Sequence, residues 1–257
     1  MKLQVMPSSF ESDGSASLRQ HLPCIVIDDR LAVDAGSLAF ACSDDQRTAI
    51  RDIVISHAHL DHIAGLPSFV DDNFTSLDGP IRVHGTGELL RALSDHVFND
   101  VIYPRFTEIE NDRGPVLEFI EFSIGRSFAA AGYEIQPIAV EHLGPSAGFI
   151  ISDEHTAVAI SGDMSATDEF WSVVEDRDDV AAIFTECSFP DALADLALRS
   201  GHLTPATLAG QIGRLPPDAP PVFVVNIKPM YRESVVRELA ESEMRVEVAL
   251  PGRIYEF

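Results

Sequence analysis

The stretch His57-Ala58-His59-Leu60-Asp61-His62 decides the fold class of this 257-residue chain. It follows an apolar run at residues 53–55 and precedes another at residues 63–66. This order is typical of a strand that ends in a polar loop, which then opens a short helix. Residues two apart on an extended chain point the same way, so His57 and His59 can hold one ion. Asp61 and His62 fall in the next turn, where they can face a second ion.

The side-chain chemistry of this loop favours a metal site. Imidazole and carboxylate groups together suit zinc, manganese or iron. The alternative is a loop of idle, solvated polar side chains, but four ligand side chains within six residues argue against it.

The composition limits the function classes. A chain of 257 residues suffices for one large α/β domain, so we expect a single domain over residues 1–257. The formal net charge is −23, and such a surface repels phosphate backbones. A large nucleic-acid partner is therefore not expected. A small anion can still bind, because a metal centre dominates its local field.

The cysteines and the apolar segments bear on the cellular compartment. Cys24, Cys42 and Cys187 are odd in number and far apart, which disfavours a disulfide framework and a cysteine-rich zinc site. The first ten residues lack the pattern of a signal peptide, and no apolar run is long enough to span a bilayer. We expect a cytoplasmic protein without a membrane partner.

Local patterns predict strands that are later mixed with helices. Residues 24–27 and 31–33 form one expected hairpin, and residues 148–151 and 157–160 form another. Helical spacing covers residues 86–97, with Thr86 as the N-cap, and helices are also expected near residues 204–213 and 233–241. This order predicts two sheets covered by helices.

Several apolar strands end in further candidate ligands. Residues 138–140 lead to His142, residues 157–160 to Asp163, residues 181–184 to Glu186, and residues 222–225 to Asn226. Each could by itself be an ordinary polar or turn residue. Their combination with the histidine loop favours one shared site.

The ligand order resembles that of the metallo-β-lactamase superfamily. The matching residues, in order, are His57, His59, Asp61, His62, His142 and Asp163. Within it, the chain resembles the class II 3′,5′-cyclic-nucleotide phosphodiesterases. That narrower resemblance covers residues 57–66, 96–99 with 103–104, 186–190, 201–205 and 228–229.

The resemblance implies an α/β fold of the αββα sandwich type, with two mixed β-sheets flanked by helices. It also implies two divalent metal ions. His57, His59 and His142 would hold one ion, Asp61 and His62 the other, and Asp163 would bridge them. The family usually has a histidine where this chain has Asn226, a weaker zinc ligand. We therefore expect zinc, with manganese or magnesium as alternatives at the second position.

The expected reaction is hydrolysis of cyclic AMP or cyclic GMP to the 5′-monophosphate by a hydroxide that the two ions share. His202 is the candidate acid for the leaving 3′-oxygen, and Glu186 would keep it protonated. A structural ion pair or a helix-cap contact is the alternative for these two residues. Asp34 is either an orienting partner of a ligating histidine or a turn residue.

The sequence says less about the substrate-binding residues than about the metal ligands. Phe98, Asn99 and Tyr103 are candidates for the base and ribose pocket, with core packing as the equal alternative. The expected partner is a small phosphodiester substrate, and a homodimer is left open.

Other functions stay open. They are a ribonuclease Z-like nuclease, which the acidity disfavours, a lactone, thioester or sulfate-ester hydrolase, and a non-catalytic sensing module.

Overall fold

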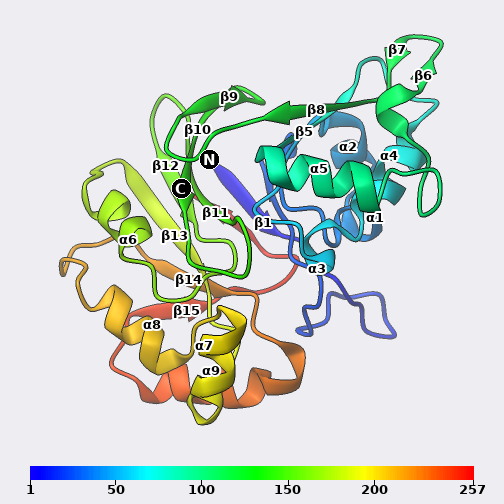
Figure 1. The fold of residues 1–257 in the computed structure, drawn as a ribbon. Helices are drawn as coiled ribbons and strands as arrows, with labels where there is room; N and C mark the ends of the chain where they lie inside the picture. Colours follow the sequence, from blue (N-terminus) through cyan, green and yellow to red (C-terminus); the bar gives the residue numbers. More distant parts are fainter.

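Two seven-stranded β-sheets packed face to face form the centre of the molecule, and helices cover the outer face of each (Figure 1). The computed structural model describes residues 1–257. This αββα arrangement confirms the expected fold class.

The first sheet has mixed strand directions. In spatial order it contains β16 (Ile254–Glu256), β1 (Lys2–Val5), β2 (Ile25–Ile27), β3 (Leu31–Val33), β4 (Asp52–Val54), β5 (Ile81–Gly85) and β8 (Leu117–Glu121). Strands β3, β4, β5 and β8 run parallel to one another. The two ends of the chain lie side by side in Figure 1, because β1 pairs with β16.

The second sheet is also mixed. In spatial order it contains β15 (Val246–Val248), β14 (Val222–Val225), β13 (Val180–Glu186), β12 (Ala157–Ile160), β11 (Ala147–Ser152), β10 (Tyr133–Ala139) and β9 (Phe128–Ala130). Strands β12 to β15 are parallel, whereas β9 to β12 alternate in direction. A small ribbon joins β6 (Glu110–Asn111) to β7 (Gly114–Pro115).

Nine α-helices and three 3₁₀ turns complete the fold. The helices are α1 (Leu38–Ala41), α2 (Asp44–Ala49), α3 (Leu60–Ile63), α4 (Leu66–Asn73), α5 (Gly87–His96), α6 (Asp168–Glu175), α7 (Ala194–Ser200), α8 (Pro205–Ile212) and α9 (Arg232–Glu241). The 3₁₀ turns are η1 (Phe106–Glu108), η2 (Asp191–Leu193) and η3 (Pro229–Tyr231). No helix has the length and apolar character needed to cross a membrane.

The apolar side chains separate into three cores, one between each pair of layers. The central core joins the inner faces of the sheets through residues such as Ile27, Phe149 and Phe184. A second core lies between the first sheet and α1, α4 and α5, and a third between the second sheet and α6, α8 and α9. Burial of these three interfaces supplies the main favourable free energy of folding.

An ion-pair cluster stands at the start of β4. The Asp52 carboxylate accepts hydrogen bonds from Arg82 at 2.7 and 2.5 Å and from His84 at 2.8 Å. Burial of Asp52 opposes its ionisation, but His84 and Arg82 outweigh burial and lower its pKa to about 2. The cluster therefore ties β4 to β5 at the end remote from the histidine loop.

Several elements expected from local patterns are present. The hairpins β2–β3 and β11–β12 are antiparallel pairs. The Thr86 side chain accepts a hydrogen bond from the backbone N–H of Leu89, which confirms it as the N-cap of α5. Thr204 caps α8 in the same way, with Pro205 at the first helical position. The three cysteines are free thiols.

Candidate metal centre

Parallel strand ends bring the predicted ligands to one edge of the sandwich. Strand β4 leads to His57, β10 to His142, β12 to Asp163, β13 ends at Glu186, and β14 leads to Asn226. The parallel neighbours β12, β13 and β14 end at the same edge of their sheet. The loop after β4 approaches from the other sheet, where the backbone N–H of Ala147 donates to the Ser56 carbonyl at 3.1 Å.

Three histidines form the first group of candidate ligands. His57 Nε2 lies 2.9 Å from His59 Nδ1, and His142 Nε2 lies 3.2 Å from the same atom. One nitrogen of each ring lies within 4.8 Å of the others. Ligands 2.0–2.1 Å from a tetrahedral zinc are roughly 3.3 Å apart, so this spacing fits a single ion.

Hydrogen bonds on the far side of two rings orient this group. His142 Nδ1 donates to the carbonyl oxygen of Gly201 at 2.7 Å. Gly201 ends α7 with φ +70°, a left-handed conformation that glycine adopts without strain. Ser56 Oγ lies 3.0 Å from His57 Nδ1. Both histidines thus keep Nε2 free to face the cluster, as an orienting hydrogen bond to a ligating histidine requires.

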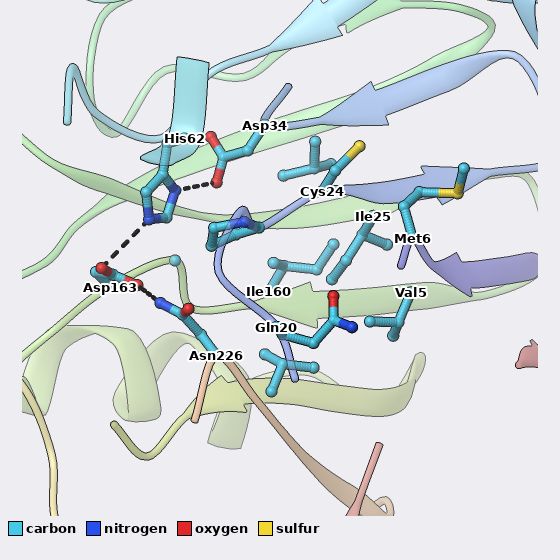
Figure 2. A pocket seen from close by; sticks show the side chains of 14 residues that line it. Val5, Met6, Gln20, Cys24, Ile25, Asp34, His62, Ile160, Asp163 and Asn226 are labelled. Carbon is cyan, nitrogen blue, oxygen red and sulfur yellow. Dashed lines mark hydrogen bonds and ion pairs between the residues drawn. The ribbon is translucent and has the colours of Figure 1, made fainter. Parts of the chain in front are cut away.

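His62 and Asp163 form a second group with His57, and both side chains are buried. Figure 2 shows Asp34, His62, Asp163 and Asn226 in a continuous chain of contacts. His62 Nδ1 donates to Asp34 Oδ2 at 2.7 Å, and its Nε2 lies 3.2 Å from Asp163 Oδ2. His62 Nε2 nevertheless lacks an aligned hydrogen-bond partner. A buried imidazole nitrogen aimed at a carboxylate is the arrangement that a bound cation satisfies.

Asp34 contacts the candidate ligand His62, as expected of an orienting partner. Besides His62, it accepts hydrogen bonds from the backbone N–H and the hydroxyl of Ser56 at 2.8 and 2.9 Å. Asp34 has φ +59°, a conformation that aspartate tolerates better than most residues. It therefore fixes the His62 ring and the start of the histidine loop together.

Asp61 and Asn226 stand at the outer side of the second group. Asp61 Oδ2 lies 3.9 Å from His62 Nε2. The side-chain amide of Asn226 donates a short hydrogen bond to Asp163 Oδ1, so its nitrogen faces the carboxylate. Asn226 has φ +51°, a left-handed conformation in which asparagine is enriched. The predicted ligand role of Asn226 requires its amide to turn its oxygen toward the ion.

A small cavity of about 50 Å³ lies behind His62 and Asp163 (Figure 2). Apolar side chains line its far side, including Met6, Ile25 and Ile160. Its volume suits a few water molecules at most. This apolar backing lowers the local dielectric and strengthens the electrostatic interactions of His62 with both aspartates.

Glu186 and His202 form a buried pair next to the second group. His202 Nδ1 donates to Glu186 Oε1 at 2.7 Å and lies 3.9 Å from Asp163 Oδ2. The Glu186 carboxylate also accepts three backbone N–H groups, those of Met164, Ser188 and Leu203. Burial disfavours protonated His202, but the Glu186 hydrogen bond and charge raise its pKa. His202, His142 and Asp163 also offer atoms within 4.8 Å of one another.

The protonation states follow from burial and charge. Burial lowers the pKa of His57 to about 2, and His62 adds to this effect. His62 is buried as well, but Asp163 and Asp34 raise its pKa well above the ordinary value. Burial opposes ionisation of Asp163, yet His62 holds its pKa well below the ordinary range. A cation held by His62 and Asp163 would replace the His62 proton, so its affinity would increase with pH.

The candidate substrate-binding residues Phe98, Asn99 and Tyr103 make contacts within the protein. Phe98 is buried in the core between the first sheet and its helices. The Asn99 side chain bonds to the backbone of residues 95, 101 and 102, and the Tyr103 hydroxyl donates to Asp71 at 3.4 Å. None of the three lines the two cavities beside the candidate metal ligands. Core packing, the equal alternative from the sequence, therefore describes Phe98.

Two contributors to the site had no sequence signal of their own. Ser56 and Gly201 act through a hydroxyl and a backbone carbonyl on the far side of the histidines. Residues of these types are common in loops, so only their contacts identify them.

A model of the beta-lactamase superfamily domain matches residues 30–219, which include the ligand positions from His57 to Asp163. A curated relative from Yersinia pestis, named a probable 3′,5′-cyclic-nucleotide phosphodiesterase, is 25% identical over 77% of this chain and 63% of its own. The 3′,5′-cyclic-nucleotide phosphodiesterase 1 of Saccharomyces cerevisiae is 28% identical over 65% of this chain and 51% of its own. This chain thus spans about half to two thirds of their lengths.

The solved structure of unliganded yeast PDE1 superposes on this fold with a TM-score of 0.77. The two chains are 18% identical, and 98% of each is covered. The likeness extends to the whole fold.

Proposed function

The chain belongs to the metallo-β-lactamase superfamily, and we propose that it is a metal-dependent phosphodiesterase that hydrolyses 3′,5′-cyclic nucleotides to 5′-monophosphates. The observation that carries this proposal is the position of the Glu186–His202 pair. His202 lies 3.9 Å from Asp163, the carboxylate shared by two of the ligand groups. A buried acid beside a cation site suits cleavage of an ester whose leaving oxygen needs a proton.

The fold family implies a divalent metal, and the residues fit one. His57, His59 and His142 would hold one ion, while His62, Asp163 and Asp61 would hold a second. Zinc is the expected ion, because imidazole nitrogens predominate. When bound, such ions neutralise charge on the phosphoryl oxygens and lower the pKa of a bound water.

The protein side chains would donate the proton and hold the candidate ligands in place. Glu186 keeps His202 protonated and holds its Nδ1, which leaves Nε2 to deliver a proton to the leaving 3′-oxygen. Asp34 and the Gly201 carbonyl hold His62 and His142 in fixed orientations. Fixed ligands and a fixed acid reduce the reorganisation required during the reaction.

The names of the two curated relatives support cyclic nucleotides as the substrate class. The net charge of −23 argues against a nuclease that must hold a long polyanion. The acidic surface repels a small monoanionic phosphodiester less strongly than a long polyanion.

The test is hydrolysis of 3′,5′-cyclic AMP and cyclic GMP by purified protein loaded with zinc and then manganese, with the product identified chromatographically. Metal-dependent formation of the 5′-monophosphate supports the proposal. The Asp61→Ala variant should lose turnover, and the exposed Asp45→Ala variant on α2 is the matched control. Cleavage of a nitrophenyl phosphodiester without cleavage of either cyclic nucleotide would refute the substrate class.

A further inference from the structure

Lys228 is a cation without a carboxylate partner beside the candidate metal ligands. The chain has only two lysines, and the other, Lys2, pairs with Asp29 at 2.6 Å. Lys228 is half-buried, and its ammonium group lies over the Phe189 ring without an ion pair or a hydrogen bond. In a chain with a net charge of −23, a cation without a carboxylate partner beside the site calls for a functional reason.

The backbone holds Lys228 in place. It follows β14 and precedes η3, and its N–H donates to the carbonyl of Ser188 at 3.2 Å. Its own carbonyl accepts the N–H of Tyr231 at 2.9 Å, which closes the η3 turn. The Lys228 backbone, two residues beyond Asn226, is therefore tied to the loop that follows β13.

The Lys228 side chain lies close to the proposed acid His202 and to the second group of candidate ligands. Lys228 Nζ lies 5.5 Å from the centre of the Phe189 ring, which is itself 5.5 Å from the His202 ring. Lys228 also lines a cavity of about 260 Å³ together with Asp61 and Asn226. The other walls of this cavity include Gln20, His21 and Met230. The cavity thus adjoins the outer side of the second ligand group.

We propose that Lys228 binds a non-bridging phosphoryl oxygen of the substrate and makes this site prefer anionic phosphodiesters over neutral esters. Asp61 is the one carboxylate on the same cavity wall, and metal coordination would take up its charge. A phosphodiester monoanion gains a charge-assisted hydrogen bond from the ammonium group, whereas a neutral ester gains little. This inference rests on the proposed hydrolytic function and adds the charge class that the site selects.

The test compares two substrates in metal-loaded wild-type protein and in Lys228→Met, which keeps an apolar stem but removes the charge. The anionic substrate is bis(p-nitrophenyl) phosphate, and the neutral one is p-nitrophenyl acetate. We expect kcat/KM for the anion to fall roughly ten- to hundredfold, mostly through KM, with less than a threefold change for the neutral ester. Lys228→Arg should restore most of the loss, and Lys2→Met is the control.

A binding measurement keeps the inference testable if turnover is low. Calorimetric titration with inorganic phosphate should give a dissociation constant at least tenfold weaker in Lys228→Met, with a smaller dependence on ionic strength than in wild type. Equal losses for both substrates, or unchanged phosphate affinity, would overturn the role of Lys228.

The two proposals can fail separately. Absence of cyclic-nucleotide hydrolysis, with a Lys228-dependent preference for the nitrophenyl phosphodiester, would remove only the proposed substrate. Normal KM for cyclic AMP in Lys228→Met would remove only the role of Lys228.

Discussion

Replacement of Glu186 by glutamine probes the proposed acid most directly. Each carboxylate oxygen accepts two hydrogen bonds, one oxygen from His202 and Met164 and the other from Ser188 and Leu203. A glutamine nitrogen at either position would face two donors in a fully buried space. Since a buried unpaired polar group costs about 1–3 kcal/mol, Glu186→Gln should lower the free energy of unfolding by about 2–5 kcal/mol.

The same change should alter the pH dependence of catalysis. Glu186 raises the pKa of His202, so the acid form persists to higher pH in wild type than it would alone. Loss of the carboxylate charge removes this stabilisation of the imidazolium. The high-pH limb of the rate profile should therefore move to lower pH in Glu186→Gln. Above that limb, turnover of a cyclic nucleotide should fall by roughly 10²-fold or more, the range of general acid catalysis.

The assay separates proton donation from other roles of the pair. Rates are measured across pH for cyclic AMP and for bis(p-nitrophenyl) phosphate, below the melting temperature of the variant. Nitrophenolate leaves without a proton, so its rate should change far less. The exposed Glu154→Gln variant is the control. Equal losses on both substrates, or an unmoved high-pH limb in a folded variant, would refute the acid assignment.

Three further predictions concern the metal, the histidine loop and the first sheet. Asn226→His should tighten a second divalent ion, measured as metal content per chain after dialysis; unchanged content would mean that position 226 does not reach the ion. Gly36→Ala should lower the free energy of unfolding by about 2–3 kcal/mol in denaturant titration, because its Cβ would lie 2.0 Å from the carbonyl oxygen of Asp61. Gly79→Ala, whose Cβ has no neighbour within 4 Å, is its control and should be near neutral. Asp52→Asn should cost about 1–2 kcal/mol at neutral pH, discounted for partial solvent screening. Because the folded-state pKa of Asp52 is lowered to about 2, this contribution is present above the unfolded pKa and is lost as pH falls from about 4 through 2. Wild type and Asp52→Asn should therefore converge in stability in acid, and a constant difference down to pH 2 would contradict this origin.

Local sequence patterns were sufficient to predict the elements whose hydrogen bonds join residues close together in the sequence. The Thr86 cap, the Thr204-Pro205 start of α8 and the β2–β3 hairpin depend on residues a few positions apart. The spacing of the histidines on the loop after β4 is also local, so the candidate ligands were identifiable before the fold was known. The sequence leaves open the side-by-side order of the strands, because it depends on contacts between distant segments.

Tertiary packing decided the side-chain roles that periodicity leaves open. Phe98 is an aromatic residue near a helix end, and only the fold places it in the core rather than at the substrate. His142 and Gly201 are 59 positions apart, yet their hydrogen bond fixes which nitrogen faces the cluster. Lys228 likewise gains its position from the packing of β14 beside β13.

The sequence by itself therefore identified the candidate ligands of the histidine loop, because ligand chemistry belongs to the residue type and its spacing along that loop. The tertiary structure alone decided how these side chains are aimed. Ring orientation, the Asn226–Asp163 hydrogen bond and the Glu186–His202 pair depend on strand ends that meet from two sheets. Such contacts form only when burial of three apolar cores offsets the entropy of joining distant parts of the chain.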